Sequence, residues 1–93
     1  MIEYDGELVA EIQKNATEKV IVGLREFKGR PFADVRIYFE DESGQYKPTK
    51  KGVAIRPSLL FDLRRAIDEA IAASGVVDDA SAHTQPDVQG AEE

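Results

Sequence analysis

Apolar and polar residues alternate with a period of two in several segments of the chain, a pattern typical of β-strands with one covered face. The alternation is clearest at residues 32–40, and comparable patterns predict further strands at residues 8–14, 19–27 and 46–55. The segments between these strands are short. Successive strands are therefore expected to pair in antiparallel order, as in a meander.

Two short connections separate the last three of these strands. Residues 28–31, KGRP, contain a glycine that can take a positive φ and a proline that cannot donate a ladder hydrogen bond. We therefore predict that strand pairing breaks at Pro31. Residues 41–45, DESGQ, are typical of a polar turn. The fourth strand is expected to bend around Pro48 and Gly52.

After Pro57 the spacing of apolar residues changes to three and four, which predicts a helix from Pro57 to Ala73 that ends at Gly75. The apolar stripe of this helix consists of Leu60, Leu63, Ile67 and Ile71. Phe61 lies outside the stripe and indicates a second contact surface. The expected fold class is α+β, with four antiparallel strands followed by one C-terminal helix (ββββα).

The chain has 93 residues, and we assign residues 1–74 to one small domain. A domain of this size has little core, and a chain without cysteine has no disulfide or thiolate metal site to stabilise it. The helix also carries more apolar surface than one short sheet needs. We therefore predict a homodimer that pairs through the C-terminal helix. Residues 75–93 lack any period, and we predict a disordered acidic tail.

The formal net charge of −6 is unevenly distributed along the sequence. Residues 1–18 hold five acidic residues and one lysine, and residues 52–93 hold eight acidic residues and three arginines. Residues 19–51, in contrast, hold eight basic residues and five acidic ones. A basic centre of this kind indicates a site for a polyanion.

The residues offer little for catalysis. There is no cysteine, and the one histidine, His83, lies in the predicted tail. No metalloprotease, P-loop or dinucleotide-binding motif occurs, so we expect no enzyme activity, no catalytic residue, no metal and no cofactor. Without a long apolar run or a signal peptide, we expect no membrane association. The expected location is the cytoplasm, at the nucleoid in a bacterium, or the nucleus in a eukaryote.

Basic residues in the centre of the chain stand close to aromatic ones, as Lys28 does to Phe27 and Lys47 to Tyr46. Single-stranded nucleic acid binds such surfaces because cations neutralise phosphates and aromatic faces stack bases. Strand aromatics more often belong to a core, where we place Phe32, and edge lysines also deter aggregation. These residues alone leave nucleic-acid binding and a dimeric protein-interaction module equally open.

Residues 25–55, REFKGRPFADVRIYFEDESGQYKPTKKGVAI, closely resemble the positive cofactor 4 family, whose domain is a single-stranded DNA-binding transcriptional coactivator. The motifs are FKGR at residues 27–30, DVRIYF at residues 34–39, an acidic glycine turn, and KPTKKG at residues 47–52. The resemblance extends over residues 18–72.

This resemblance implies a curved antiparallel sheet followed by a helix, paired as a dimer, that binds unpaired DNA with little sequence preference. It assigns base stacking and phosphate contact to eight residues: Phe27, Lys28, Arg30, Arg36, Phe39, Lys47, Lys50 and Lys51. Phe27 and Phe39 are the expected stacking residues. Lys28 and Arg30 would contact phosphates beside Phe27, Arg36 would project from the third strand, and the three lysines would line the remaining wall.

Two departures from the family pattern matter. Phe39 stands where the family often has tryptophan, which implies weaker stacking, and simple alternation places it on the face opposite Arg36. The chain also begins almost at the first strand, as in a minimal bacterial or phage form. Single-stranded DNA binding with a role in transcription regulation is thus the leading hypothesis. The alternatives are a dimeric module that docks an acidic partner such as the transcription machinery, and RNA binding.

Overall fold

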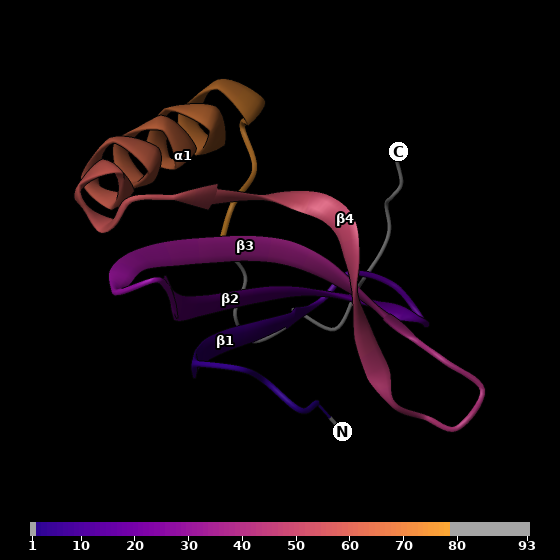
Figure 1. The fold of residues 1–93 in the computed structure, drawn as a ribbon. Coiled ribbons are helices and arrows are strands. Elements are labelled where there is room, and N and C mark those ends of the chain that lie inside the picture. Colours follow the sequence, from indigo (N-terminus) through magenta and orange to yellow (C-terminus); the bar gives the residue numbers. More distant parts are fainter. Residues whose placement is uncertain (1, 79–93) are drawn as a thin grey trace. The chain divides into compact units, whose positions relative to one another are not determined.

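The computed structural model describes residues 2–78, which fall into a sheet unit up to residue 57 and a helix unit after it. The sheet unit contains four strands, each antiparallel to the next, in the order β1-β2-β3-β4 (Figure 1). The strands are β1 (Glu7–Gln13), β2 (Glu18–Phe27), β3 (Arg30–Glu40) and β4 (Tyr46–Ile55). The predicted ββββα fold is confirmed.

The connection between β2 and β3 is a two-residue turn. Lys28 and Gly29 both have positive φ, 52° and 79°, which is the conformation of a type I′ hairpin turn. The prediction that pairing breaks at Pro31 is wrong, because Pro31 pairs with Glu26. In such a hairpin this second rung is one without hydrogen bonds between the partners, so the proline nitrogen faces away from β2. The pairing of β3 with β4 begins only at Ala33, and the missing N–H therefore costs no ladder bond.

The fourth strand contains a bulge. Arg36 pairs with Gly52 and Tyr38 with Pro48, so the three residues Thr49–Lys51 lie opposite the single residue Ile37. Extra residues in one strand bend it and increase its twist. Figure 1 shows β4 changing direction sharply along its length. The predicted bend between Pro48 and Gly52 is thus a bulge with two extra residues.

The core lies on one face of the sheet, under the N-terminal segment. Ile21, Tyr38 and Tyr46 are buried, and Ile2 and Tyr4 pack against them. Ile2 forms an isolated parallel bridge with Tyr46, and the rings of Tyr4 and Tyr38 are 6.3 Å apart between centroids. Burial raises the pKa of the Tyr4 phenol. The N-terminal segment is therefore part of the fold of the sheet unit.

The other face of the sheet, which carries the alternating apolar residues of β3, is less covered. Phe39 is 48% exposed and Val53 is 53% exposed. The side chains of Val20, Val35, Ile37 and Val53 contribute to a shallow hollow of about 340 Å³. The cluster of buried apolar side chains is thus on the face opposite to the one that alternation in β3 indicates, because the N-terminal segment covers that opposite face. On the alternating face of β3, Ala33 is buried.

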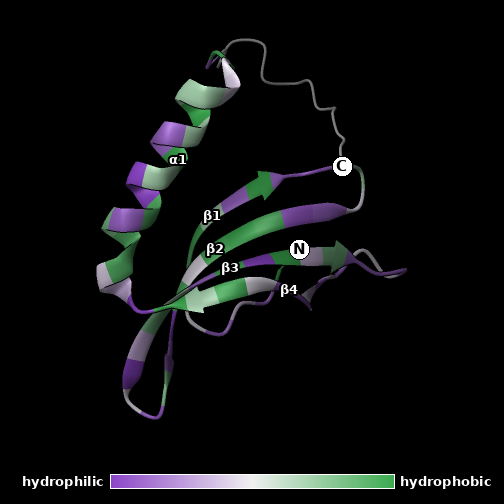
Figure 2. Cartoon of the chain, turned by 90° about the horizontal axis from the view of Figure 1, so that it is seen from above, coloured by the Kyte–Doolittle hydropathy of each residue, from purple (hydrophilic) through white to green (hydrophobic). Residues whose placement is uncertain are grey.

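The helix unit begins at Ser58, within a short 3₁₀ turn, η1 (Pro57–Leu59), and contains the helix α1 (Leu60–Ser74). Gly75 ends the helix in a left-handed conformation with φ 73°, and its N–H donates to the carbonyl of Ile71. The predicted helix and its stop are confirmed. Apolar and polar residues alternate along α1 in Figure 2, and none of its residues is buried.

No helix among residues 2–78 is long and apolar enough to span a bilayer. From residue 79 onward, the predicted tail and His83 lie outside the described residues.

Candidate nucleic-acid interface

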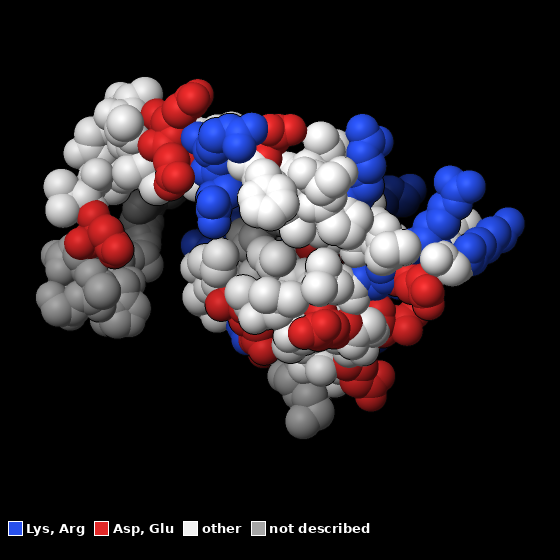
Figure 3. Space-filling view, turned by 90° about the vertical axis from the view of Figure 1, so that its left-hand side faces the viewer, with Lys and Arg blue, Asp and Glu red and all other residues white. Residues whose placement is uncertain are grey.

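The tip of the β2–β3 hairpin presents an aromatic ring to solvent between basic side chains. Phe27 is 66% exposed, and the Nζ of Lys28 lies 5.3 Å from the centroid of its ring. Arg30 is the cross-strand partner of Phe27, so the two side chains share a face. Figure 3 shows Lys and Arg side chains projecting at the right-hand margin of the view, with uncharged side chains between them. The hairpin thus combines a stacking surface with cations.

The guanidinium of Arg36 is held by the fold. Its Nε and Nη2 donate to the Asp34 carboxylate at 3.0 Å and 2.9 Å, and its Nη1 donates to the carbonyl of Thr49 at 3.0 Å. The Asp34 side chain is only 2% exposed and that of Arg36 is 20% exposed. Hydrogen bonding to Asp34 raises the pKa of Arg36. Arg36 therefore fastens β3 to the bulge of β4, and direct contact of Arg36 with nucleic acid stays a prediction.

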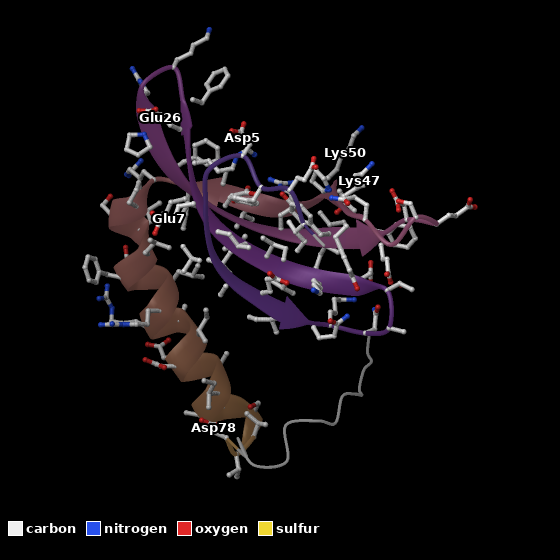
Figure 4. All side chains as sticks on the ribbon, turned by 90° about the horizontal axis from the view of Figure 1, so that it is seen from below. Asp5, Glu7, Glu26, Lys47, Lys50 and Asp78 are labelled. Atoms are coloured by element: carbon white, nitrogen blue, oxygen red, sulfur yellow. The ribbon has the colours of Figure 1, made fainter. Side chains whose placement is uncertain are left out.

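Thr49 organises the bulge that carries the lysines. Its Oγ1 donates to the carbonyl of Ile37 at 2.8 Å and accepts the backbone N–H of Lys51 at 3.1 Å. Both Lys50 and Lys51 are exposed. In Figure 4, the labelled Lys47 and Lys50 side chains extend from β4 toward the same side. The bulge fixes the backbone from which these cations project.

Phe39 lies away from the hairpin tip. It pairs with Lys47 across β3 and β4, so these two side chains share a face. Because the extra residues of the bulge are in β4, alternation along β3 is unbroken and Phe39 remains opposite Arg36. Lys51 borders the hollow on the Phe39 face. The structure therefore places Phe27, Lys28 and Arg30 in one group, the tip group, and Phe39, Lys47 and Lys51 in another, the rung group.

The turn between β3 and β4 contacts one member of the rung group, Lys47. The Asp41 carboxylate accepts hydrogen bonds from the hydroxyl of Ser43 at 2.7 Å and from the N–H of Gln45 at 3.0 Å. These bonds, that of Ser43 foremost, lower the pKa of Asp41 to about 2. The Nζ of Lys47 lies 3.4 Å from the same carboxylate. Asp41 therefore both closes the turn and orients a predicted binding lysine.

The family model of the transcriptional coactivator p15 (PC4) matches residues 14–66, which is more than half of the chain. The chain belongs to the PC4 family. Two crystal structures of a PC4 homologue from Burkholderia pseudomallei, in orthorhombic and tetragonal forms, share 35% identity with it at a TM-score of 0.68. Each alignment covers 71% of this chain, and 89% and 97% of the respective crystallised chains.

The PC4 match includes all eight predicted site residues together with β2, β3 and β4, whereas β1 and the N-terminal segment precede it. The resemblance drawn from the motifs is thus confirmed as family membership. Among residues 2–78, no three acidic, histidine or cysteine side chains gather as a metal site would require.

Two further features of this PC4-family chain were not predicted from its sequence. Thr49 gave no signal, because its role depends on the register of β4 against β3. Phe32 was assigned to the core, yet it is only partly buried, and the guanidinium carbon of Arg25 lies 5.7 Å from the centroid of its ring. The four-residue connection expected at residues 28–31 concealed this arrangement. With the two-residue turn that the structure has, Phe32 faces Arg25 across the hairpin.

Proposed function

We propose that this PC4-family protein binds single-stranded DNA with little sequence preference and takes part in the regulation of transcription. The observation that carries the proposal is the tip group. An exposed phenylalanine at a tight turn adds nothing to the core, and a cation stands beside its ring. This combination suits an unpaired base and its phosphate.

The form of the site favours single strands over duplexes. A duplex hides the faces of its bases, and reading it requires an element that enters a groove. The tip group instead offers the face of a ring, to which any base can stack, so sequence preference is expected to be weak. The rung group offers a second ring and two more cations on the other face of the sheet. We propose that the rung group makes a second contact, with the same DNA strand or with another one.

We further propose that the functional unit is a homodimer that pairs through α1. Three large apolar side chains of this helix are exposed: Phe61 by 64%, Ile67 by 51% and Ile71 by 46%. A monomer gains nothing from apolar surface of this kind, and a second copy of the helix can cover it. Sedimentation equilibrium at micromolar concentration tests this part, and a monomer would contradict it.

Fluorescence anisotropy with labelled oligo-dT, the matching duplex and an RNA of equal length tests the binding function. We expect oligo-dT to bind more tightly than the duplex. Phe27→Ala should weaken binding by about 5- to 150-fold, the equivalent of about 1–3 kcal/mol for one stacked base. Val77→Ala is the control, because it removes an apolar side chain that is 78% exposed and lies outside the hairpin, outside α1 and outside the PC4 match. Equal or tighter binding of the duplex would contradict the proposal.

A salt series separates the cations from the rings. Lys50→Ala and Lys51→Ala should each reduce the slope of log affinity against log salt by about 0.7. Phe27→Ala should leave the slope unchanged, because it removes no charge. If none of the three nucleic acids binds detectably, the alternative function, a module that docks an acidic protein partner, is favoured.

A further inference from the structure

We propose that Arg25 and Phe32 form a second site for one base and one phosphate beside Phe27. In the free protein the Asp5 carboxylate pairs with the Arg25 guanidinium, and a phosphate of the nucleic acid displaces it. This inference rests on the proposed binding of single-stranded DNA. It extends the site by three residues outside the eight that the family motifs indicate.

The register of the hairpin places this second pair directly behind the first. Phe27 pairs with Arg30, and two residues further from the turn Arg25 pairs with Phe32. Side chains two residues apart share a face, so all four side chains lie on the same face of the hairpin. In the pair nearer the turn the aromatic residue is on β2 and the basic residue on β3, and in the next pair on that face the order is reversed. Two rings thus lie about 7 Å apart along the hairpin, each beside a cation.

Arg25 is poised over the ring of Phe32. Its guanidinium carbon is 5.7 Å from the ring centroid, within the range of a cation–π contact. Its Nε donates to the backbone carbonyl of Asp5 at 3.0 Å, which fixes the side chain in this position. A guanidinium held in this way keeps other N–H groups for a phosphate, since its five donors form a planar fork.

The Asp5 carboxylate is the group that a phosphate would replace. Its Oδ2 lies 3.4 Å from Nη2 of Arg25, and the Asp5 side chain is 96% exposed (labelled in Figure 4). An ion pair so open to water is weak and is broken readily by a competing anion. The backbone bond from Arg25 to Asp5 does not depend on this carboxylate. Displacement therefore leaves Arg25 positioned over Phe32.

The core does not require a ring at position 32. The buried apolar cluster consists of Ile21, Tyr38 and Tyr46, with Ile2 and Tyr4 packed against it, and Phe32 is not a member. Its cross-strand partner is a cation rather than an apolar residue. An aromatic ring with a basic partner, beside an exposed ring that has the same arrangement, is suited to binding rather than to packing.

Single tryptophan reporters test the proposal directly, because the chain contains no tryptophan. Phe32→Trp, Phe27→Trp and Val77→Trp, the last of these beyond the end of α1, would each be titrated with oligo-dT while indole fluorescence and anisotropy of the labelled DNA are recorded. Stacking of a base quenches the indole, so we expect quenching at positions 32 and 27 and none at position 77. Quenching at position 27 alone would overturn this inference and leave the proposed function standing. Absence of DNA binding in the wild type would overturn both.

Affinity measurements supply the second test. Phe32→Leu should weaken oligo-dT binding by about fivefold or more, and Phe32→Tyr should restore it, because only the latter keeps the ring. Asp5→Asn should strengthen binding by up to about fivefold. Glu42→Gln, which removes one exposed acid from the distant β3–β4 turn, is the control for charge alone. If Asp5→Asn has no larger effect than Glu42→Gln, or if Phe32→Leu binds as the wild type does, the second site does not exist.

Discussion

Replacement of Arg36 by methionine should reveal whether this residue serves the fold or contacts nucleic acid. The Arg36 guanidinium is bonded to the buried Asp34 carboxylate and to the carbonyl of Thr49 in the bulge. Methionine keeps the apolar length of the side chain and removes the three donors. Asp34 is then left with its negative charge and without its partner.

The magnitude follows from the burial of the two side chains. Breaking a buried ion pair by removal of one partner costs about 3–5 kcal/mol, because the remaining charge is uncompensated. The Asp34 side chain is 2% exposed, but that of Arg36 keeps 20% of its surface in solvent, and water can reach the gap. We therefore expect the lower end of that range, a loss of about 3 kcal/mol in the free energy of unfolding. That is a large part of the stability of a small domain.

Urea denaturation followed by circular dichroism measures the effect. The midpoint should fall while the m-value stays constant, because the surface exposed on unfolding is unchanged. The double variant Asp34→Asn, Arg36→Met should be more stable than the sum of the two single changes predicts, by about 1–3 kcal/mol. The gain arises because the double variant no longer buries an unpaired charge.

Anisotropy with oligo-dT supplies the discriminating result, with Lys51→Met as the control that also removes one positive charge. Under conditions where both variants are folded, Arg36→Met should weaken binding no more than Lys51→Met. The structural role of Arg36 would be refuted if Arg36→Met lost less than about 1 kcal/mol of stability and yet weakened binding more than the control. Arg36 would then be a ligand of the nucleic acid.

Three further outcomes follow from the turn and the bulge. Gly52→Ala should lower the midpoint of thermal unfolding strongly, because its Cβ would lie 2.5 Å from the backbone oxygen of Val35; an unchanged midpoint would contradict this close approach. Thr49→Val should weaken oligo-dT binding and Thr49→Ser should restore it, because the hydroxyl that bonds to Ile37 shapes the bulge; equal affinities would show that the bulge forms without that bond. Asp41, whose pKa is lowered to about 2, stabilises the fold fully above about pH 4 and loses this effect as the pH falls through 2. The difference in melting temperature between wild type and Asp41→Asn should therefore shrink from pH 5 to pH 2, and a constant difference would contradict it.

Local patterns in the sequence were sufficient for the elements and for the family. The period of two indicated strands at positions within two residues of β1 to β4, and Gly75 marked the end of α1. The periods of strands and helices, and the residues that end helices, depend on neighbours in the chain. They can therefore be predicted without knowledge of the fold. The motifs from Phe27 to Gly52 likewise identified the PC4 family, which the comparisons confirm.

Which side chains meet was decided by pairing between strands. A turn of two residues rather than four brought Phe32 opposite Arg25 and kept Pro31 in the ladder. Two extra residues in β4, and none in β3, left Phe39 on the face away from Arg36.

Tertiary packing also decided which face of the sheet is covered. Alternation in β3 marked the face of Val35 and Phe39 as apolar, but the N-terminal segment packs Tyr4 on the opposite face. The sequence by itself thus determined the elements, their order, the family and the basic centre of the chain. Register, bulge position and the docking of residues distant in sequence came only from the tertiary structure. The physical reason is that hydrogen bonds and packing between distant segments set them, and a shift of one residue moves a side chain to the other face.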